Sequence, residues 1–285
     1  MLITQYSGKL VTIVCLLMLT LAGCGQADIV PSTQEATVTS PPVSATLTKV
    51  NTPSPEVPSD WQALRPGLEI RRLDVDEKPL LAVRIDLAQI SLQVHYDPQN
   101  PKAVAGWEAV LPDALVVVNA GFFEPDNTTS GLLIVDGVAI GESFDPATRY
   151  LEHSGMLTVR GERAEIHMLS SCPPSKCMQA EQGVQGLPVL ILNSLPVDFA
   201  LPEREARRTV AGIDRDGNLL LIVAYEGGMT LVELRAVLLV TDMELVSALN
   251  LDGGPSTGIS VDGEGNTIMV DSVSEVPSVI ALYAR

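Results

Sequence analysis

The sequence predicts an α+β fold: a single strand-rich domain of mixed or antiparallel sheets with a few helices. The chain has 285 residues, of which 46% are hydrophobic, enough for a sizeable core and at most two ordinary domains. After Trp61, short β-branched or alternating apolar runs separated by turn signals outnumber helical patterns. Composition does not change again before Arg285, so we expect one domain over residues 60–285.

The N-terminus has the features of an export signal. Lys9 precedes an apolar run from Leu10 to Leu21, and no acidic residue lies in or before this run. The run is short for a transmembrane helix, which needs roughly 20 apolar residues, although a retained transmembrane anchor is the alternative. Leu21-Ala-Gly-Cys24 resembles the lipobox of bacterial lipoproteins, whose cysteine is acylated. The resemblance implies a signal peptide at residues 1–23, a lipid anchor on Cys24 and a membrane-anchored protein at the bacterial cell envelope.

A linker follows the predicted anchor. Residues 24–59 are rich in proline, threonine and serine and contain few large apolar residues that could build a core. Such a composition is typical of a disordered tether. We therefore expect these residues to hold the domain away from the membrane and to carry no site.

The cysteines of the body favour a disulfide over a metal site. Cys172 and Cys177 are the only cysteines after the anchor, and an exported pair this close in sequence suits a disulfide. A metal site would need two further ligands, and no nearby histidine or cysteine supplies them. We expect no cofactor, although the sequence leaves open whether a divalent cation helps to hold phosphate near Asp252.

The formal net charge of −17 bears on the partners of this protein. Nucleic acids and anionic lipid surfaces bind basic patches, so neither is an expected partner. Solubility outside the cell is the simplest explanation of the charge. An anionic substrate would therefore have to be held by local groups.

Taken in chain order, the first predicted elements are strands followed by one short helix. Apolar runs, one of them strictly alternating, indicate strands, and a segment around Trp107 indicates a helix. A β-branched run then stops at the small-residue turn Asn119-Ala-Gly. These elements are strands at Leu80–Leu87, Ile90–Tyr96 and Ala114–Asn119, and a helix at Lys102–Leu111.

The second half contains hairpins and the clearest helix. Asp-Gly between apolar runs predicts hairpins over Leu132–Ile140 and Ala211–Ala224, and a further hairpin is expected over Gly258–Val270. Thr230 and Glu233 form a capping-box pattern, so a helix is expected to begin near Thr230. It leads into a predicted strand from Val246 to Leu251.

The segment from Ala248 to Ile259 is the strongest signal of a functional site. An apolar strand runs directly into Asp252, two glycines and two hydroxyl residues. Gly253 and Gly254 can adopt backbone angles closed to other residues, so their N–H groups could form an anion nest. Asp252 could serve as an acid or base, a nucleophile or a ligand of hydroxyl groups, or it could simply cap a turn.

Five sequence blocks resemble, in order, the phosphodiester glycosidase family. The blocks are Asn119-Ala-Gly-Phe-Phe123, Thr129-Ser-Gly-Leu-Leu-Ile-Val-Asp-Gly137, Gln185-Gly-Leu-Pro-Val-Leu190, Arg207-Arg-Thr-Val-Ala-Gly212, and Gly228-Met-Thr-Leu-Val-Glu-Leu234 leading into Asn250-Leu-Asp-Gly-Gly254. They span most of residues 103–271. One block alone is weak, but the ordered set is fairly specific.

The resemblance implies a pocket that recognises a sugar joined through phosphate. Such a substrate needs a cation and N–H donors for the phosphate, and an acid or nucleophile at the anomeric carbon. The implied catalytic residues are Asp252, Arg208 and Asn119, with Arg208 as the bidentate phosphate ligand. The implied substrate-binding residues are Thr209, Asn250, Gly253, Gly254, Ser256 and Thr257, with Glu226 a candidate second carboxylate.

Two positions depart from the family pattern. Pro255 stands where the family usually has a third glycine, which removes an N–H donor and restricts Gly254. Tyr225-Glu226-Gly227 stands where many relatives carry an Asp-Gly-Arg-like turn, so a basic group near the phosphate is missing. Arg207 and Arg208 could each be an ordinary ion-pair arginine, and Glu226 a solvated loop residue.

We therefore expect a hydrolase that removes a sugar, with N-acetylglucosamine one candidate, from a sugar-1-phosphodiester in envelope or extracellular glycans. The alternative is a non-catalytic glycan-binding or envelope-organising lipoprotein that uses the same pocket. A general solute-binding lipoprotein is the weakest alternative, because the sequence shows too few helices for two α/β lobes.

Overall fold

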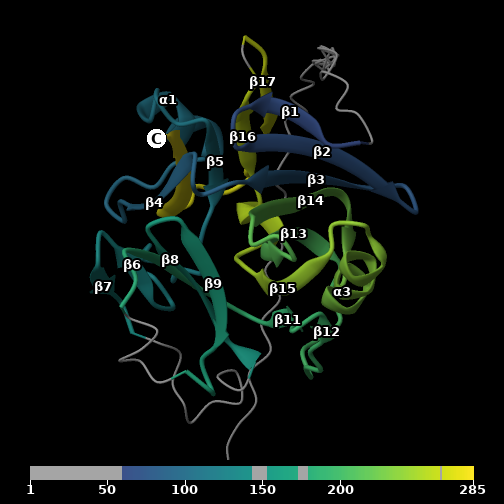
Figure 1. Cartoon of the computed structure of the whole chain (residues 1–285). Coiled ribbons are helices and arrows are strands. Elements are labelled where there is room, and N and C mark those ends of the chain that lie inside the picture. The colour runs from purple at the N-terminus through teal and green to yellow at the C-terminus, as the bar shows by residue number, and fades with distance from the viewer. Residues whose placement is uncertain (1–59, 143–152, 173–178, 264) are drawn as a thin grey trace, which may run out of the picture. The chain divides into compact units, whose positions relative to one another are not determined.

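The structure of the protein is a computed structural model that describes residues 60–142, 153–172, 179–263 and 265–285 (Figure 1). The predicted signal, Cys24, the linker and Cys177 lie outside these residues. None of the described helices is long and apolar enough to cross a membrane.

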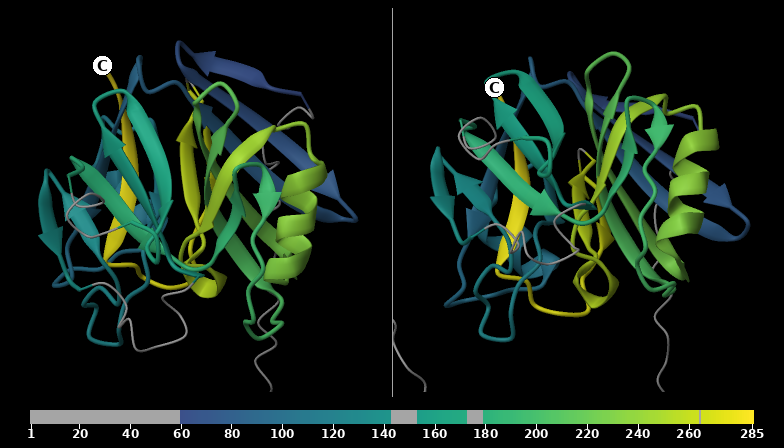
Figure 2. Two further views of the ribbon diagram at one scale, coloured as in Figure 1. Left: turned by 60° about the horizontal axis from the view of Figure 1, so that its bottom comes forward. Right: turned by 90° about the horizontal axis from the view of Figure 1, so that it is seen from below.

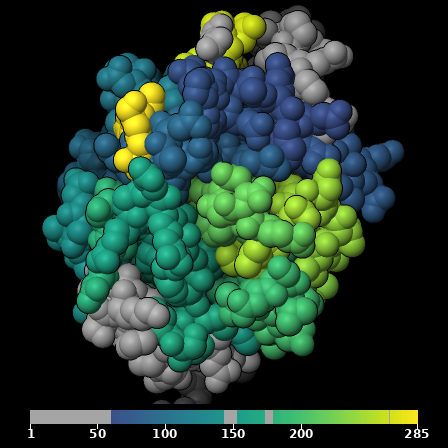
Figure 3. Space-filling model, in the orientation of Figure 1, coloured from purple at the N-terminus to yellow at the C-terminus, as the bar shows by residue number. Residues whose placement is uncertain are grey.

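An eight-stranded sheet forms the largest layer, and its neighbouring strands pair in antiparallel fashion (Figure 1). In spatial order its strands are β1 (Gln62–Arg65), β2 (Leu68–Val75), β3 (Lys78–Ile85), β14 (Leu219–Met229), β13 (Ala206–Asp214), β15 (Leu245–Asn250), β11 (Val189–Leu192) and β12 (Leu195–Pro196). Figure 3 shows β1 to β3, in blue, beside the green surface of the later strands. Strands distant in sequence therefore build one layer.

Two five-stranded antiparallel sheets complete the body. One has the order β17 (Thr267–Val270), β16 (Ile259–Asp262), β5 (Val116–Asn119), β18 (Ser278–Ala284) and β4 (Ile90–Tyr96). The other has the order β7 (Val138–Ile140), β6 (Leu133–Val135), β10 (Gln182–Gly186), β8 (Gly155–Arg160) and β9 (Arg163–Met168). The C-terminal β18 pairs with β4 and β5, which joins the end of the domain to its beginning.

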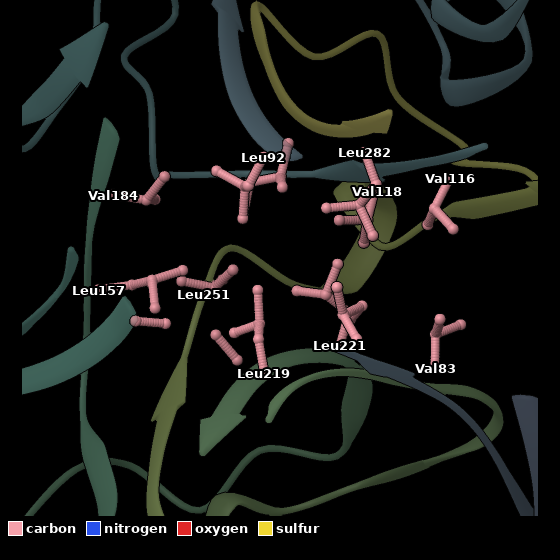
Figure 4. Close-up of a cluster of buried hydrophobic side chains, with 14 of the residues drawn as sticks. Val83, Leu92, Val116, Val118, Leu157, Val184, Leu219, Leu221, Leu251 and Leu282 are labelled. Carbon is pink, nitrogen blue, oxygen red and sulfur yellow. The ribbon is translucent and has the colours of Figure 1, made fainter. Parts of the chain in front are cut away.

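One central core is shared by all three sheets. Figure 4 shows Leu219 and Leu221 of the eight-stranded sheet facing Val118 and Leu282 of the β5–β18 sheet, while Leu251 lies beside Leu157 of the third sheet. Leu251 follows β15 directly and is fully buried. This packing fixes the chain at the residue immediately before Asp252.

A second core lies on the opposite face of the eight-stranded sheet. Helix α3 (Leu231–Val240) covers that face, and its Leu234 and Leu238 pack against residues of β13, β14 and β15 (Figure 2). The predicted capping box is present: the Thr230 hydroxyl accepts from the Glu233 N–H, and the Glu233 carboxylate accepts from the Thr230 N–H. The helix therefore begins where the sequence predicted.

The predicted hairpins are confirmed, and their turns follow from local chemistry. Asp136 and Gly137 both have positive φ, at 49° and 79°, as a tight Asp-Gly hairpin requires. At the second hairpin, Asp214 Oδ1 accepts the N–H groups of Asp216 and Asn218. Asp214 thus closes the turn of this hairpin.

The predicted fold class needs one correction. The described residues are strand-rich, but they are mostly β rather than clearly α+β, with two α-helices, α1 (Val104–Val110) and α3. The β1–β2 and β8–β9 hairpins and the final strand β18 were not predicted. Charged residues such as Arg71, Arg72 and Glu165 interrupt the apolar alternation of β2 and β9, so the periodicity of these two strands is weak. The strand β18 carries no charged residue, and its apolar run has no alternation.

Cys172 is buried and disulfide-bonded. Its expected partner, Cys177, lies outside the described residues. Within the described ranges, no group of three or more His, Cys, Asp or Glu side chains could hold a metal ion.

The central core predicts the effect of truncating Leu251. Leu251→Ala removes a fully buried side chain and should lower the free energy of unfolding by about 2–5 kcal/mol. The matched control is Leu195→Ala, because Leu195 is 66% exposed and its truncation should cost less than about 0.5 kcal/mol. Urea unfolding followed by circular dichroism measures both, and equal losses would contradict the packing described.

Candidate active site

The candidate site is the loop that follows β15, from Asp252 to Gly258. It contains a short 3₁₀ turn, Gly254–Ser256, and leads into β16. One end is fixed by Leu251 in the core, and the other enters the β16–β5 pairing. The loop therefore crosses from the eight-stranded sheet to a five-stranded one.

Asn119, the last residue of β5, is the hydrogen-bond centre under this loop. Its Nδ2 donates to the Asp252 carbonyl at 2.7 Å, and its Oδ1 accepts the Thr209 hydroxyl at 2.8 Å and the Gly258 N–H at 3.1 Å. The Thr209 and Thr257 hydroxyl oxygens lie 3.3 Å apart. Because Asn119, Thr209 and Thr257 are fully buried, they hold the loop in place rather than face a ligand.

Gly253 and Gly254 are each needed in the loop, for different physical reasons. A Cβ on Gly253 would lie 2.9 Å from the Arg207 carbonyl oxygen, so a side chain would push the loop away from β13. Gly254 has open space around it but a φ of 61°, which disfavours other residues. The expected unusual backbone angle is therefore present at Gly254, while Gly253 is extended and is required for close approach.

Asp252 carries an unusually basic carboxyl group. Burial raises its pKa from 3.8 to about 6, while hydrogen bonds from the Ser256 hydroxyl and the Gly253 N–H partly oppose the shift. The Gly253 N–H donates to Asp252 Oδ1 at 2.8 Å. Among the described residues, neither a cation nor a second carboxylate contributes to this shift. A carboxyl group with a pKa near neutrality can exchange protons at physiological pH.

Most backbone N–H groups of the loop are already used within the protein. The Gly253 N–H serves Asp252, and those of Ser256 and Thr257 donate to the Gly253 and Gly254 carbonyls. Pro255 has no N–H to donate. The backbone therefore offers an anion few donors, fewer than the sequence pattern suggested.

The Arg208 backbone lies close to Gly253, but its side chain makes hydrogen bonds outside the loop. Its Nε donates to the Met229 carbonyl at 2.8 Å, and its Nη2 donates to the Arg204 carbonyl. Burial lowers its pKa, an effect that nearby Glu203 opposes. Arg208 thus fastens β13 to the segment that enters α3.

The remaining predicted residues divide into two groups. Ser256 contacts the Asp252 carboxyl group, whereas the Asn250 side chain donates to the carbonyls of Leu187 and Leu251 and is buried. Glu226 is exposed on β14 beside Tyr225, and no described hydrogen bond links it to the Asp252 loop. The structure therefore brings Asn119, Thr209, Asp252, Gly253, Ser256 and Thr257 together, and leaves Glu226 and the Arg208 guanidinium outside this network.

Two parts of the site were not predicted. The N–H groups of Val273 and Ser274 both donate to the Pro255 carbonyl, so residues 271–274 form a second wall around the 3₁₀ turn. The Arg207 Nη2 donates to the Asp271 carbonyl at 2.9 Å on this wall. The direction of the Arg207 side chain could not be found from strand alternation, because the β13 ladder is irregular at this residue.

The fold and this loop define a class: an antiparallel β protein with a half-buried carboxyl group of raised pKa and two arginines on the adjacent strand. A phosphodiester glycosidase family model matches residues 112–283, more than half of the chain. The chain therefore belongs to the phosphodiester glycosidase family. No curated protein sequence matches it.

Two solved structures are similar in fold to this chain. The catalytic domain of zebrafish N-acetylglucosamine-1-phosphodiester alpha-N-acetylglucosaminidase, auto-inhibited by its pro-peptide, matches with a TM-score of 0.57 at 17% identity, covering 81% of this chain and 87% of that one. A hypothetical protein from Synechocystis matches with a TM-score of 0.52 at 17% identity and 76% coverage of this chain. This chain spans 62% of the Synechocystis protein, which is less than two thirds of its length.

The raised pKa of Asp252 predicts a pH-dependent cost in stability. The folded protein binds this proton more tightly than the unfolded chain, so the free energy of unfolding should fall as pH rises from about 4 to about 6, by up to about 3 kcal/mol. Asp252→Asn should remove this slope and stabilise the protein above about pH 6. Urea unfolding from pH 4 to 7.5 measures the effect.

Asp86→Asn is the matched control for this measurement. A hydrogen bond from Gln89, with one from the Ala88 N–H, lowers the pKa of Asp86, so its contribution has the opposite sign and is lost only as pH falls below about 4. If Asp252→Asn kept the wild-type slope between pH 4 and 6, the burial of the Asp252 carboxylate would be contradicted.

Proposed function

We propose that this protein hydrolyses a sugar-1-phosphodiester and releases the sugar, with N-acetylglucosamine the first candidate. The observation that carries this proposal is the Asp252 carboxyl group, which burial makes basic at the end of a glycine-containing loop. Membership of the phosphodiester glycosidase family supports the reaction class. The zebrafish structure supports the choice of sugar only through its fold and its name.

The chemistry of the leaving group favours a base role for Asp252. A phosphate monoester has a second pKa near 6, so it departs readily and needs little protonation. The attacking water, in contrast, must lose a proton as its oxygen bonds to the anomeric carbon. The bond between that carbon and the phosphate oxygen breaks, the electron pair leaves with the phosphate, and the water proton passes to Asp252.

Burial makes this base effective at neutral pH. An aspartate with a pKa of about 6 binds a proton more strongly than an ordinary aspartate and is still mostly ionised at pH 7. Its negative charge also stabilises the positive charge that develops on the sugar ring in the transition state. Asn119 contributes by holding the Asp252 carbonyl, and hence the position of the carboxyl group.

The test is the hydrolysis of an N-acetylglucosamine-1-phosphodiester by the soluble body, residues 60–285. The ratio kcat/KM should rise with pH through about 6 and then level off, because the ionised carboxyl group is the active form. Asp252→Asn should lower kcat by about 10²- to 10⁴-fold, whereas Asp86→Asn should change it little. Equal turnover by wild type and Asp252→Asn would remove Asp252 from the mechanism. Glycan binding without product release would favour the non-catalytic alternative.

We also propose that the protein is held at the bacterial envelope by acylation of Cys24. The lipobox-like Leu21-Ala-Gly-Cys24 and the Pro-, Ser- and Thr-rich residues that follow support this placement. In a bacterial host fed an alkyne fatty acid, the wild-type chain should become labelled and remain with the membrane fraction. Cys24→Ala should lose the label, while Cys15→Ala should keep it. Retained labelling of Cys24→Ala would disprove the anchor.

A further inference from the structure

Arg207 and Arg208 are the arginines whose backbone lies against the candidate site, at Gly253, and their side chains point in different directions. Side chains alternate along the regularly paired part of β13, from Arg208 to Ile213, so Arg208 shares a face with Val210, and Thr209 shares the other with Ala211. The ladder is irregular at Arg207, whose side chain is placed by the bond from its Nη2 to the Asp271 carbonyl, on the 271–274 wall. Val210 belongs to the core beneath α3, whereas Ala211 belongs to the central core. The Thr209 hydroxyl donates a hydrogen bond to Asn119 beneath the Asp252–Gly258 loop. Arg207 is therefore the arginine on the loop side.

Neither arginine is neutralised in the way that the other half-buried arginines are. The ion pairs among the described residues include Arg65, Arg71, Arg84 and Arg235, but neither Arg207 nor Arg208. This is unusual in a chain with 35 acidic and 18 basic residues. Within the described part of the chain, no carboxylate lies within 4.0 Å of either guanidinium, although the charges of Asp271 and Glu203 act on the pKa of Arg207 and Arg208, respectively.

Their hydrogen bonds separate the two roles. Arg208 uses both Nε and Nη2 on backbone carbonyls. Arg207 uses Nη2 on the Asp271 carbonyl, while its Nε is buried and has no partner among the described residues. The nearby Asp271 carboxylate instead accepts the Ala105 and Ser272 N–H groups. Arg207 is half-buried, and only its Nη2 has a hydrogen-bond partner among the described residues, so its terminal nitrogens retain N–H groups that a phosphate could accept.

The loop itself increases the need for such a donor. Its N–H groups are largely committed within the protein, and Pro255 supplies none. The Arg207 backbone contacts the loop at Gly253, and its guanidinium reaches the wall that holds the Pro255 carbonyl. A cation at this position borders the turn that carries Ser256, the hydroxyl partner of Asp252.

We infer that Arg207 binds the phosphate of the substrate, and that Arg208 positions β13 against α3. This inference rests on the proposed function. As the sugar–oxygen bond breaks, the phosphate changes from one negative charge to nearly two, so a guanidinium there stabilises the transition state more than the bound substrate. Arg207 therefore supplies selectivity for a phosphate leaving group over an uncharged one.

Two measurements test the role of Arg207. Calorimetry with methyl phosphate, the simplest alkyl phosphate monoester, reports phosphate binding without catalysis. Arg207→Gln should weaken this binding by about 10- to 100-fold, because a hydrogen bond to a charged group contributes roughly 1.5–3 kcal/mol. Arg207→Lys should keep part of the affinity, since it retains charge but loses the bidentate fork.

Kinetics supply the second measurement. Arg207→Gln should lower kcat/KM for the sugar phosphodiester by about 10- to 100-fold and change it little for an uncharged aryl N-acetylglucosaminide. Arg204→Gln is the matched control, because it removes the same charge from an exposed neighbour and should leave both substrates and methyl phosphate binding unchanged. Circular dichroism checks that each variant is folded.

The outcomes separate this inference from the proposed function. Methyl phosphate binding that depends on Arg207, without turnover of any phosphodiester, would support the phosphate site and overturn the enzymatic proposal. Phosphodiester turnover that Arg207→Gln leaves intact would overturn the inference and keep the enzyme. Loss of binding in folded Arg208→Gln but not in Arg207→Gln would also overturn it and assign the phosphate to Arg208.

Discussion

The site depends on the buried amide of Asn119. One side chain links three segments that are distant in sequence, because it donates to the Asp252 loop and accepts from Thr209 and from Gly258. These bonds cross the boundary between two sheets and lie out of contact with water. In such surroundings an unpaired amide is costly, so the alternative positions of the loop are disfavoured. The resulting geometry is specified by hydrogen bonds rather than by apolar packing alone.

Burial has opposite effects on the adjacent residues Leu251 and Asp252. Leu251 is fixed in the central core, and the next residue is a carboxyl group that burial makes reluctant to ionise. The same surroundings that stabilise the leucine therefore destabilise the charged aspartate. This opposition is characteristic of functional sites, where a group is kept in an unfavourable ionisation state because the rest of the fold holds it there.

Local sequence signals predicted the elements that depend on local chemistry. Thr230 with Glu233 located the helix, and Asp136-Gly137 located a hairpin, because capping and turn preferences act over a few residues. The β8–β9 hairpin was missed because its stability comes from tertiary pairing with β10 rather than from a clear alternation. The sequence blocks shared with the family pointed to Asn119, Thr209 and Asp252. The direction of the Arg207 side chain could be seen only in the structure, where its Nη2 donates to the Asp271 carbonyl. The 271–274 wall has no turn or motif signal that would place it beside Pro255.

The unpaired arginines have a consequence for how a substrate arrives. The chain carries a net charge of −17, so the proposed phosphodiester substrate would be repelled at long range and attracted only close to Arg207. Salt near 0.15 M screens charges beyond about 8 Å, which would weaken this repulsion more than the short phosphate contact proposed for Arg207. Encounter should therefore become faster as ionic strength increases, the reverse of enzymes that steer their substrates. Such a protein suits substrates concentrated nearby on a surface better than dilute anions captured from solution.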